Sequence, residues 1–339
     1  MISATITDVA RHAGVSIKTV SRVLNREPNV RLETRERVEA AVAALDYRPS
    51  QSARSLAGAR SYLIGLLFDN PSAAYLSDVQ FGAVDRCRAS GRHLVIEPVD
   101  STASDLPALI RQSCLGLRPD GMIVTPPICD DVRVLDCLEG LAIPYVRLGP
   151  RALEARGPQI VLDDRAASAA MTRHLIAQGH RDIGFILGHP DHGASERRRR
   201  GFVDAMAEAG LSVPEHRVAR GLFSFDSGMR AAEILLQTDR PTAIFASNDD
   251  MALGVMAAAQ RAGLRTPQDL SVAGFDDTQA ARAAWPPLTT VSQPITLMSA
   301  AAADMLIAGD ATGPFVDGPP VRTFDFSIQT RGSVAPPAG

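Results

Sequence analysis

The sequence predicts two folds in one chain: an all-α head at the N-terminus, then an α/β body of two doubly wound parallel-sheet subdomains. The head is indicated by short amphipathic helical stretches before residue 50. The body is indicated by apolar, strand-like runs that alternate with helical stretches from Ser61 onward. Because 279 residues follow residue 60, two subdomains are favoured over a single sheet.

A helix-turn-helix is predicted within residues 7–25. Thr7 can cap its first helix and Ser16 its second, since hydroxyl oxygens accept from the free N–H groups there. Gly14 supplies the turn, because glycine adopts a positive φ without steric cost. Apolar residues at helical spacing face inward, namely Val9, Ala10, Ala13, Val20, Val23 and Leu24. In this motif the second helix enters the DNA major groove.

A third helix is predicted from about Thr34 to Leu45 by its apolar stripe, and it is broken at residues 47–50. The following segment, residues 51–58, is either a plain linker or a short helix that ends at Gly58.

Charge is distributed unevenly along the chain. Residues 1–60 carry a net charge of +4 and the remainder −7, which favours nucleic-acid binding by the head alone. Lys18 is the only lysine and lies on the outer side of the second helix, so we interpret it as a DNA contact.

In the body, eight apolar runs predict buried parallel strands. These are residues 63–68, 93–99, 121–125, 143–148, 159–162, 183–187, 242–246 and 270–275. Helical stretches between them include residues 78–89, 166–178, 195–209, 226–236 and 249–262.

Polar residues follow directly on many of these runs, including Asp69, Asn70, Thr125, Arg147, Asn248 and Asp276. Ligands of open α/β sheets bind beyond the carboxyl ends of the strands. Carboxylates and amides there suit a ligand rich in hydroxyls. Helix capping is the alternative role for each of them, because Asn and Asp cap helices at such junctions.

Other functional classes lack support in the sequence. No nucleophile-elbow, P-loop, dinucleotide-binding or HExxH zinc motif occurs, so we expect no enzyme, cofactor or metal site. The cysteines, Cys87, Cys114, Cys129 and Cys137, lack metal-ligand spacing and are interpreted as reduced thiols. The sequence contains neither a signal peptide nor a membrane-spanning run, so a soluble cytoplasmic protein is expected.

At this point the motifs resemble those of the lactose-repressor (LacI/GalR) family of bacterial transcription regulators. The resemblance rests on the head, on residues 53–58, and on the body signatures SNDDMALG (247–254), VAGFDD (272–277) and PLTTVSQP (287–294). It extends from about Thr5 to Thr330.

For DNA binding, the resemblance implies a three-helix head and a hinge, residues 50–57, that becomes helical on operator DNA. Leu56 matches the family's minor-groove wedge, and Ala53 matches a small hinge position near the groove. Ile17, Lys18 and Arg22 match the base-reading positions. A further set is expected to serve phosphates and helix caps: Thr7, Ser16, Thr19, Ser21 and Asn25.

For the body, the resemblance implies a periplasmic-binding-protein-like core whose two subdomains are joined by three crossovers. The expected boundaries are 1–49 for the head, 50–60 for the hinge, 61–332 for the core and 333–339 for the tail. Within the core, one subdomain is expected at about 62–162 plus 293–320, and the other at about 163–292 plus 321–331.

The implied effector pocket contains Asp69, Asn70, Tyr75, Thr125, Arg147, Arg198, Phe223, Asn248, Asp276 and Gln293. Two of these positions have alternatives. Phe223 can instead be a core residue, and Arg147 either favours an acidic sugar or pairs with Asp163 or Asp164. Trp285 is interpreted as interface or core packing.

Functionally, the resemblance implies a dimeric repressor of carbohydrate-utilisation genes that a sugar effector releases from a near-palindromic operator. The tail after Arg331 lacks the leucine heptads that tetrameric members need, which favours a homodimer. One alternative is a co-repressor-dependent regulator that binds a purine-like ligand, because Tyr75 and Phe223 permit a planar base. Another, from a different class, is a solute-binding protein without a regulatory role.

Overall fold

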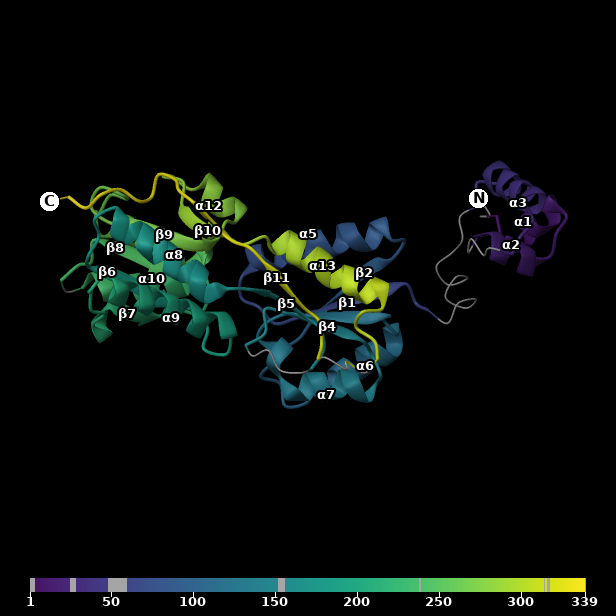
Figure 1. Ribbon diagram of the computed structural model, residues 1–339, viewed down its shortest axis with the longest axis horizontal. Coiled ribbons are helices and arrows are strands. Elements are labelled where there is room, and N and C mark those ends of the chain that lie inside the picture. The colour runs from purple at the N-terminus through teal and green to yellow at the C-terminus, as the bar shows by residue number, and fades with distance from the viewer. Residues whose placement is uncertain are drawn as a thin grey trace. The chain divides into compact units, whose positions relative to one another are not determined.

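The computed structural model describes residues 4–24, 29–47, 60–151, 156–237, 239–313, 315 and 318–338. The chain forms two compact units, Met1–Tyr62 and Leu63–Gly339 (Figure 1). In the part of the chain described, no helix is long and apolar enough to cross a membrane.

Among its described residues the first unit holds three helices, α1 (Ile6–Ala13), α2 (Ile17–Leu24) and α3 (Leu32–Ala44). Val9, Val20 and Val38, one from each helix, are fully buried in its small core. Gly14 ends α1 with a φ of 63°, a conformation that glycine adopts without strain. Arg37 of α3 fixes this turn, because its Nη2 donates to the Ala13 carbonyl at 2.7 Å.

The cap of α1 differs from the prediction. Thr5, not Thr7, is the N-cap residue, and its hydroxyl accepts from the backbone N–H of Asp8 while the Asp8 carboxylate accepts from the Thr5 N–H. Thr7 is exposed within the first turn of α1. Thr5 is the cap because Asp8 lies three residues after it, so each side chain can accept from the other residue's backbone N–H in a capping box.

The second unit contains two six-stranded sheets, each the centre of a lobe. The first has the order β11-β5-β4-β3-β1-β2 and the second β12-β10-β9-β8-β6-β7. First-sheet strands are β1 (Leu63–Phe68), β2 (His93–Pro98), β3 (Gly121–Val124), β4 (Tyr145–Leu148), β5 (Gln159–Leu162) and β11 (Val321–Phe324). Second-sheet strands are β6 (Ile183–Leu187), β7 (Val218–Arg220), β8 (Ala243–Ala246), β9 (Ser271–Asp276), β10 (Thr289–Ser292) and β12 (Ser327–Gln329).

Helices cover both faces of the first sheet. The helices α5 (Ala73–Ala89) and α13 (Ile295–Ala308) pack together on one face, and α6 (Leu106–Leu117) and α7 (Val132–Gly140) lie on the other (Figure 1). The short 3-10 helix η1 (Ile128–Asp130) precedes α7. We call this body the first lobe.

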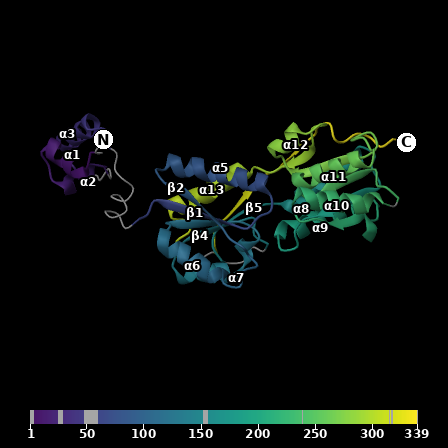
Figure 2. The same cartoon turned by 180° about the vertical axis from the view of Figure 1, so that it is seen from behind.

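The second sheet is covered by two helix pairs, α8 (Asp164–Ala177) with α9 (Gly193–Glu208), and α10 (Phe225–Leu236) with α11 (Asp249–Arg261) (Figure 2). Successive strand residues point to opposite faces, so Phe185 packs in the same core as α8 and α9, and Ile186 in the core with α10 and α11. The short η2 (Glu215–Arg217) and α12 (Gln279–Ala283) complete this second lobe.

The chain crosses between the lobes three times, after β5, after β10 and after β11. The expected assignment of residues 321–331 to the second subdomain is therefore wrong for its first part. Val321–Phe324 forms β11 and pairs in parallel with β5, because this pairing gives backbone N–H and C=O groups of the segment hydrogen-bond partners. Within residues 321–331 only β12 joins the second sheet, where it pairs with β10 in antiparallel orientation.

Candidate functional site

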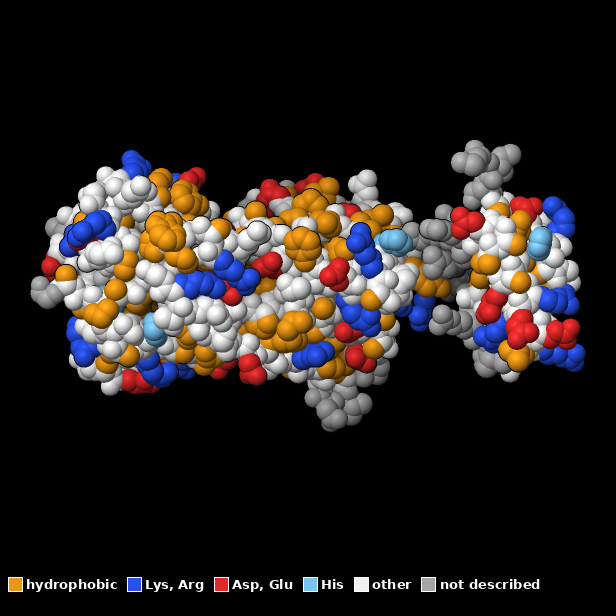
Figure 3. All heavy atoms as spheres, turned by 90° about the horizontal axis from the view of Figure 1, so that it is seen from above, with side chains coloured by type: hydrophobic (Ala, Val, Ile, Leu, Met, Phe, Trp, Pro, Cys, Tyr) orange, Lys and Arg blue, Asp and Glu red, His pale blue; other side chains and the backbone are white. Residues whose placement is uncertain are grey.

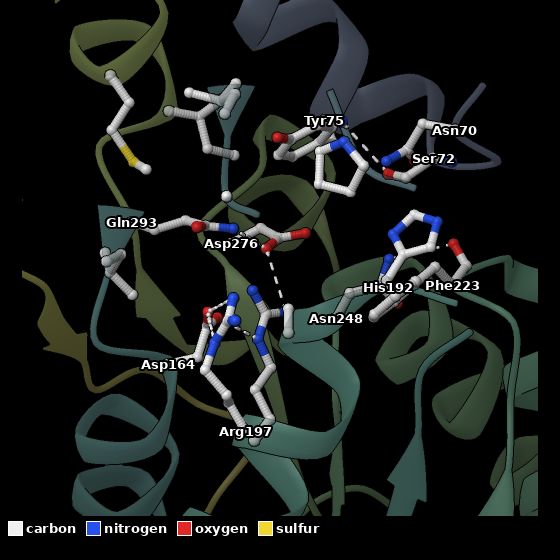
Figure 4. A pocket seen from close by; sticks show the side chains of 18 residues that line it. Asn70, Ser72, Tyr75, Asp164, His192, Arg197, Phe223, Asn248, Asp276 and Gln293 are labelled. Atoms are coloured by element: carbon white, nitrogen blue, oxygen red, sulfur yellow. Dashed lines mark hydrogen bonds and ion pairs between the residues drawn. The ribbon is translucent and has the colours of Figure 1, made fainter. Parts of the chain in front are cut away.

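A cavity lies between the two lobes (Figure 4). It falls at the carboxyl ends of the central strands, where α/β sheets bind ligands. The residues that line it are Asn70, Ser72, Tyr75, Pro126, Leu148, Gly149, Leu162, Asp164, His192, Ala194, Arg197, Arg198, Phe223, Asn248, Asp276, Gln293, Ile295 and Met298.

Two arginines of α9 share one carboxylate at the first turn of α8. Arg198 Nε donates to Asp164 Oδ1 at 2.8 Å, and Arg197 Nη2 donates to Asp164 Oδ2 at 3.0 Å. Arg198 Nη1 also donates to the Ser247 carbonyl at 2.5 Å, and Arg197 Nη1 to the Pro150 carbonyl at 2.9 Å. The positive charge on this wall is thus largely balanced, and both guanidinium groups are held in place.

Asp276 ends β9 and points into the cavity beside Gln293 (Figure 4). Gln293 Nε2 donates to Asp276 Oδ1 at 2.5 Å, and Arg198 Nη1 lies 3.9 Å from the same oxygen. Burial raises the pKa of Asp276 well above its ordinary value, and Arg198 opposes this rise. The φ of Asp276 is 126°, a strained conformation for a residue with a side chain. Such strain is often found at binding sites.

Asn248 both caps α11 and fixes Phe223. Its Oδ1 accepts from the Met251 N–H at 3.0 Å, and its Nδ2 donates to the Phe223 carbonyl at 3.1 Å. Phe223 has a φ of 61°, and its ring lies 5.1 Å from that of His192. Burial lowers the pKa of His192 to about 3, so this side chain is neutral at pH 7. The capping role and the cavity position of Asn248 therefore coexist.

The first-lobe rim of the cavity is formed before and within α5. Asn70 Oδ1 accepts from the Ser72 N–H at 2.9 Å, and Ser72 Oγ caps the helix by accepting from the Tyr75 N–H at 3.3 Å. The same hydroxyl donates across the cavity edge to Asp250 of the second lobe at 2.6 Å. Burial raises the pKa of Tyr75, whose ring faces the cavity.

Arg147 does not reach the cavity. It is buried inside the first lobe, where Nη2 donates to Asp130 Oδ1 at 2.5 Å and Nε donates to the Cys129 carbonyl at 2.7 Å. Its partner is therefore Asp130, and neither Asp163 nor Asp164. Since this pair neutralises the guanidinium, its expected role as an effector contact is wrong.

Asp69 and Thr125 also lie outside the residues that line the cavity. The Asp69 carboxylate accepts from the Ser101 N–H at 2.9 Å and so closes a loop. Thr125 is fully buried, and its hydroxyl is directed to the Leu67 carbonyl of β1. Both side chains are occupied by nearby backbone groups, so their expected places in the pocket are wrong.

Seven of the expected effector residues do line the cavity: Asn70, Tyr75, Arg198, Phe223, Asn248, Asp276 and Gln293. Sequence reasoning missed the others. Asp164 carried a signal, because it lies two residues after the end of strand β5, and Arg197 precedes Arg198. His192 and the aliphatic residues carried none, since histidine before a helix and leucine in a strand are common in any fold.

The second helix of the head presents the expected outward side chains. Ile17 and Lys18 are exposed, and Ser21 and Arg22 are partly exposed. Ser16 caps α2, because its Oγ accepts from the Thr19 N–H at 3.1 Å. Three other residues expected to contact DNA, Asn25, Ala53 and Leu56, lie outside the described residues.

Potential metal ligands are scattered. Within the described ranges, no group of three His, Cys, Asp or Glu side chains could hold an ion. All four cysteines are buried free thiols. The single tryptophan, Trp285, is 91% exposed, so the expectation of core packing is wrong and the interface interpretation remains.

Comparison with known proteins agrees with both parts of this architecture. Residues 5–50 match the model for bacterial regulatory proteins of the lacI family, and residues 172–334 match the periplasmic binding protein-like domain. The HTH-type transcriptional repressor PurR of Escherichia fergusonii is 38% identical over 309 residues, which cover 90% of this chain and 89% of the relative. The PurR repressor of Klebsiella pneumoniae strain 342 is also 38% identical with the same coverage.

Solved structures give the same result. The Lac repressor dimer bound to operator and the anti-inducer ONPF has a TM-score of 0.81 at 30% identity, covering 98% of this chain and all of that one. The transcriptional regulator CelR in complex with cellobiose has a TM-score of 0.73 at 28% identity, covering 97% of this chain and 99% of that one. Relatives of this kind are regulators of transcription and not enzymes. The chain belongs to the LacI family of DNA-binding transcriptional repressors, whose members respond to a small-molecule effector.

Proposed function

We propose that this repressor is a homodimer that controls carbohydrate-utilisation genes and leaves its operator when a neutral sugar binds between the lobes. The observation that carries the proposal is the group of polar side chains on the second-lobe wall, Arg198, Asn248 and Asp276, with Gln293 at a crossover. Sugar hydroxyls both donate and accept, so they match a wall that offers carboxylate, amide and guanidinium groups together.

The balance of charge supports a neutral effector over a phosphorylated one. Asp164 is shared by Arg197 and Arg198, and Arg147 is paired with Asp130 inside the first lobe. An added phosphate would have to compete with these carboxylates for the arginines. By contrast, Asp276 Oδ2 accepts no hydrogen bond from any residue that the structure describes, and it is free to accept from a hydroxyl.

For DNA reading, we propose that Ile17, Lys18 and Arg22 contact base edges in the major groove while the capping hydroxyls serve the phosphates. Two such heads on a dimer would read the two halves of a near-palindromic operator. Effector binding would change the angle between the lobes and with it the spacing of the hinges. Effector and operator affinity are then linked reciprocally.

Exposed apolar side chains support the dimer. Phe81 of α5, Leu297 of α13 and Trp285 after α12 are all exposed. Figure 3 looks onto the face that carries these helices and shows hydrophobic side chains gathered on it. Large exposed apolar groups on one face are typical of a protein interface.

The effector proposal is tested first with the purified full chain. Thermal shift against neutral sugars, sugar phosphates and purines identifies a ligand, because a ligand at 100 times its dissociation constant stabilises by about 2.7 kcal/mol. Asp276→Ala should then lose this response and retain operator binding. The matched control is Asp277→Ala, since Asp277 pairs with Arg282 and Arg331 outside the cavity and should leave the response intact. A normal response in Asp276→Ala would remove this carboxylate from the site.

A second candidate is a purine-like co-repressor that strengthens operator binding. It is favoured by the three rings at the cavity, those of Tyr75, His192 and Phe223, which suit a planar base. The same panel separates the candidates, because a response to purines alone would replace the sugar. The solute-binding alternative without regulation is set aside, since the chain carries the family's DNA-binding head.

A further inference from the structure

The turn between the first two helices of the head is held by a side chain of the third. Arg37 of α3 donates from Nη2 to the Ala13 carbonyl at 2.7 Å and to the Gly14 carbonyl at 3.2 Å. These partners lie 24 and 23 residues before Arg37, so the contact ties α3 to the turn. Helix α2, which the proposed function places in the major groove, begins three residues after Gly14, at Ile17.

The carbonyls at the end of α1 explain why a cation lies here. The last four carbonyls of an α-helix lack partners within the helix. One of them is served by the turn itself, since the Val15 N–H donates to the Ala10 carbonyl at 3.0 Å. Arg37 serves the Ala13 carbonyl, and its charge suits the negative end of the helix dipole. Because the donor is charged, this hydrogen bond is stronger than one between neutral groups.

The glycine of the turn makes this restraint matter. Gly14 has a φ of 63°, and glycine loses more conformational freedom on folding than any other residue. A Cβ atom placed on Gly14 would lie 3.5 Å from Arg37 Nη2, so the guanidinium packs directly against this residue. The next residue of α3, Val38, is fully buried in the core of the head together with Val20 of α2. A firmly seated helix thus holds the link from which α2 starts.

We infer that Arg37 is a positioning residue for operator recognition. By holding the turn it fixes the direction in which α2 leaves, and with it the base-contacting side chains, while Arg37 itself does not contact DNA. The inference rests on the proposed reading of base edges by α2. A phosphate contact is the competing role, because Arg37 is exposed and many protein–DNA hydrogen bonds go to phosphates. The two carbonyls that Nη2 already serves favour positioning.

Binding to two duplexes tests the inference. The first duplex is selected by the full chain from a random-sequence library, and the second has the same composition in scrambled order. Fluorescence anisotropy gives the dissociation constant of each duplex over a series of salt concentrations. The variants are Arg37→Leu, Arg37→Lys and the control Arg11→Leu, which also removes one positive charge from the head, at an exposed residue that pairs with Asp8.

Positioning predicts a loss of discrimination between the two duplexes. In Arg37→Leu the ratio of the two affinities should fall about tenfold, the lower end of what a charge-assisted hydrogen bond contributes. The salt dependence should stay equal to that of Arg11→Leu. Arg37→Lys should recover most of the ratio, since its ammonium group can donate to the same carbonyls. Arg11→Leu should keep the ratio of the wild-type chain.

The competing outcomes are distinct. A phosphate contact would weaken both duplexes alike and reduce the slope of log affinity against log salt by about 0.9, which overturns the inference. An unchanged ratio in Arg37→Leu overturns it as well. Hydrogen exchange on the full chain checks the fold of the variant: residues 13–20 should exchange faster while α3 stays protected, and equal loss of protection in all three helices overturns the positioning role.

Lys18→Ala separates this inference from the proposed reading of bases. If Lys18→Ala loses discrimination and Arg37→Leu keeps it, only the role of Arg37 fails. If both variants keep the discrimination of the wild-type chain, the proposed base reading by α2 fails together with the inference.

Discussion

Asp164→Ala is the perturbation that tests the charge network of the cavity most directly. The Asp164 side chain is 7% exposed and that of Arg198 is 6% exposed, so this pair is buried. Removal of one partner of a buried pair leaves an uncompensated charge and typically costs about 3–5 kcal/mol. Arg197 loses its partner as well, but it is more exposed and keeps the Pro150 carbonyl. We therefore expect about 3–5 kcal/mol of lost stability.

The assay is urea unfolding of the full chain followed by circular dichroism. Asp204→Ala is the matched control, since Asp204 also pairs with an arginine of the second lobe, Arg165, but both side chains are well exposed. Exposed pairs contribute about 0–1 kcal/mol, so the control should remain within that range. A loss below about 1.5 kcal/mol in Asp164→Ala, or one equal to the control, would refute the argument from burial.

Two further predictions concern assembly and pH. Trp285→Asp should convert the dimer to a monomer in sedimentation velocity, because it places a charge on the proposed interface. The control Ile234→Asp, on the exposed side of α10, should remain a dimer. If Trp285→Asp also remains a dimer, this face is not the dimer interface. Burial lowers the pKa of His192 from 6.5 to about 3. Below pH 6.5, His192 is therefore protonated in the unfolded chain and stays neutral in the folded chain. The free energy of unfolding, measured with urea, should therefore fall between pH 6.5 and pH 5 by at most about 1.4 kcal/mol per pH unit. In His192→Gln it should fall less steeply with pH. Equal pH dependence in the two proteins would show that His192 does not contribute.

The eight apolar runs of the sequence correspond to strands, including the edge strand β2, whereas the structure adds four strands that were not predicted: β7, β10, β11 and β12. Strands such as β1 and β8 are buried on both faces and therefore read as continuous apolar runs. The outer strands β11 and β12 are short, and β11 is largely and β12 partly exposed, so they carry no such pattern. Their pairing depends on β5 and β10, which are far away in the sequence, and this is why residues 321–324 were assigned to the wrong lobe.

The position of polar residues at strand ends predicted part of the cavity, and the family resemblance added Tyr75, Arg198 and Phe223 from other elements. Asp276 ends β9 and Asn248 lies two residues after β8, so both could be anticipated. Arg147 also lies near the end of a strand, but its side chain points to the other face of the sheet and pairs with Asp130 there. The side chain of a strand residue can point to either face of the sheet, and the sequence does not show which carboxylate will lie beside it.

The single lysine gives the protein an unusual chemical asymmetry. Lys18 lies exposed on α2 of the head, and every other cationic side chain in the chain apart from histidine is an arginine. A guanidinium stays protonated and does not acylate under conditions in which a lysine amine does. Apart from any terminal amine, Lys18 is therefore the one amine that an acetyl donor would modify. Acetylation would remove one positive charge from the second helix of the helix-turn-helix and leave the side chains of the two lobes unmodified.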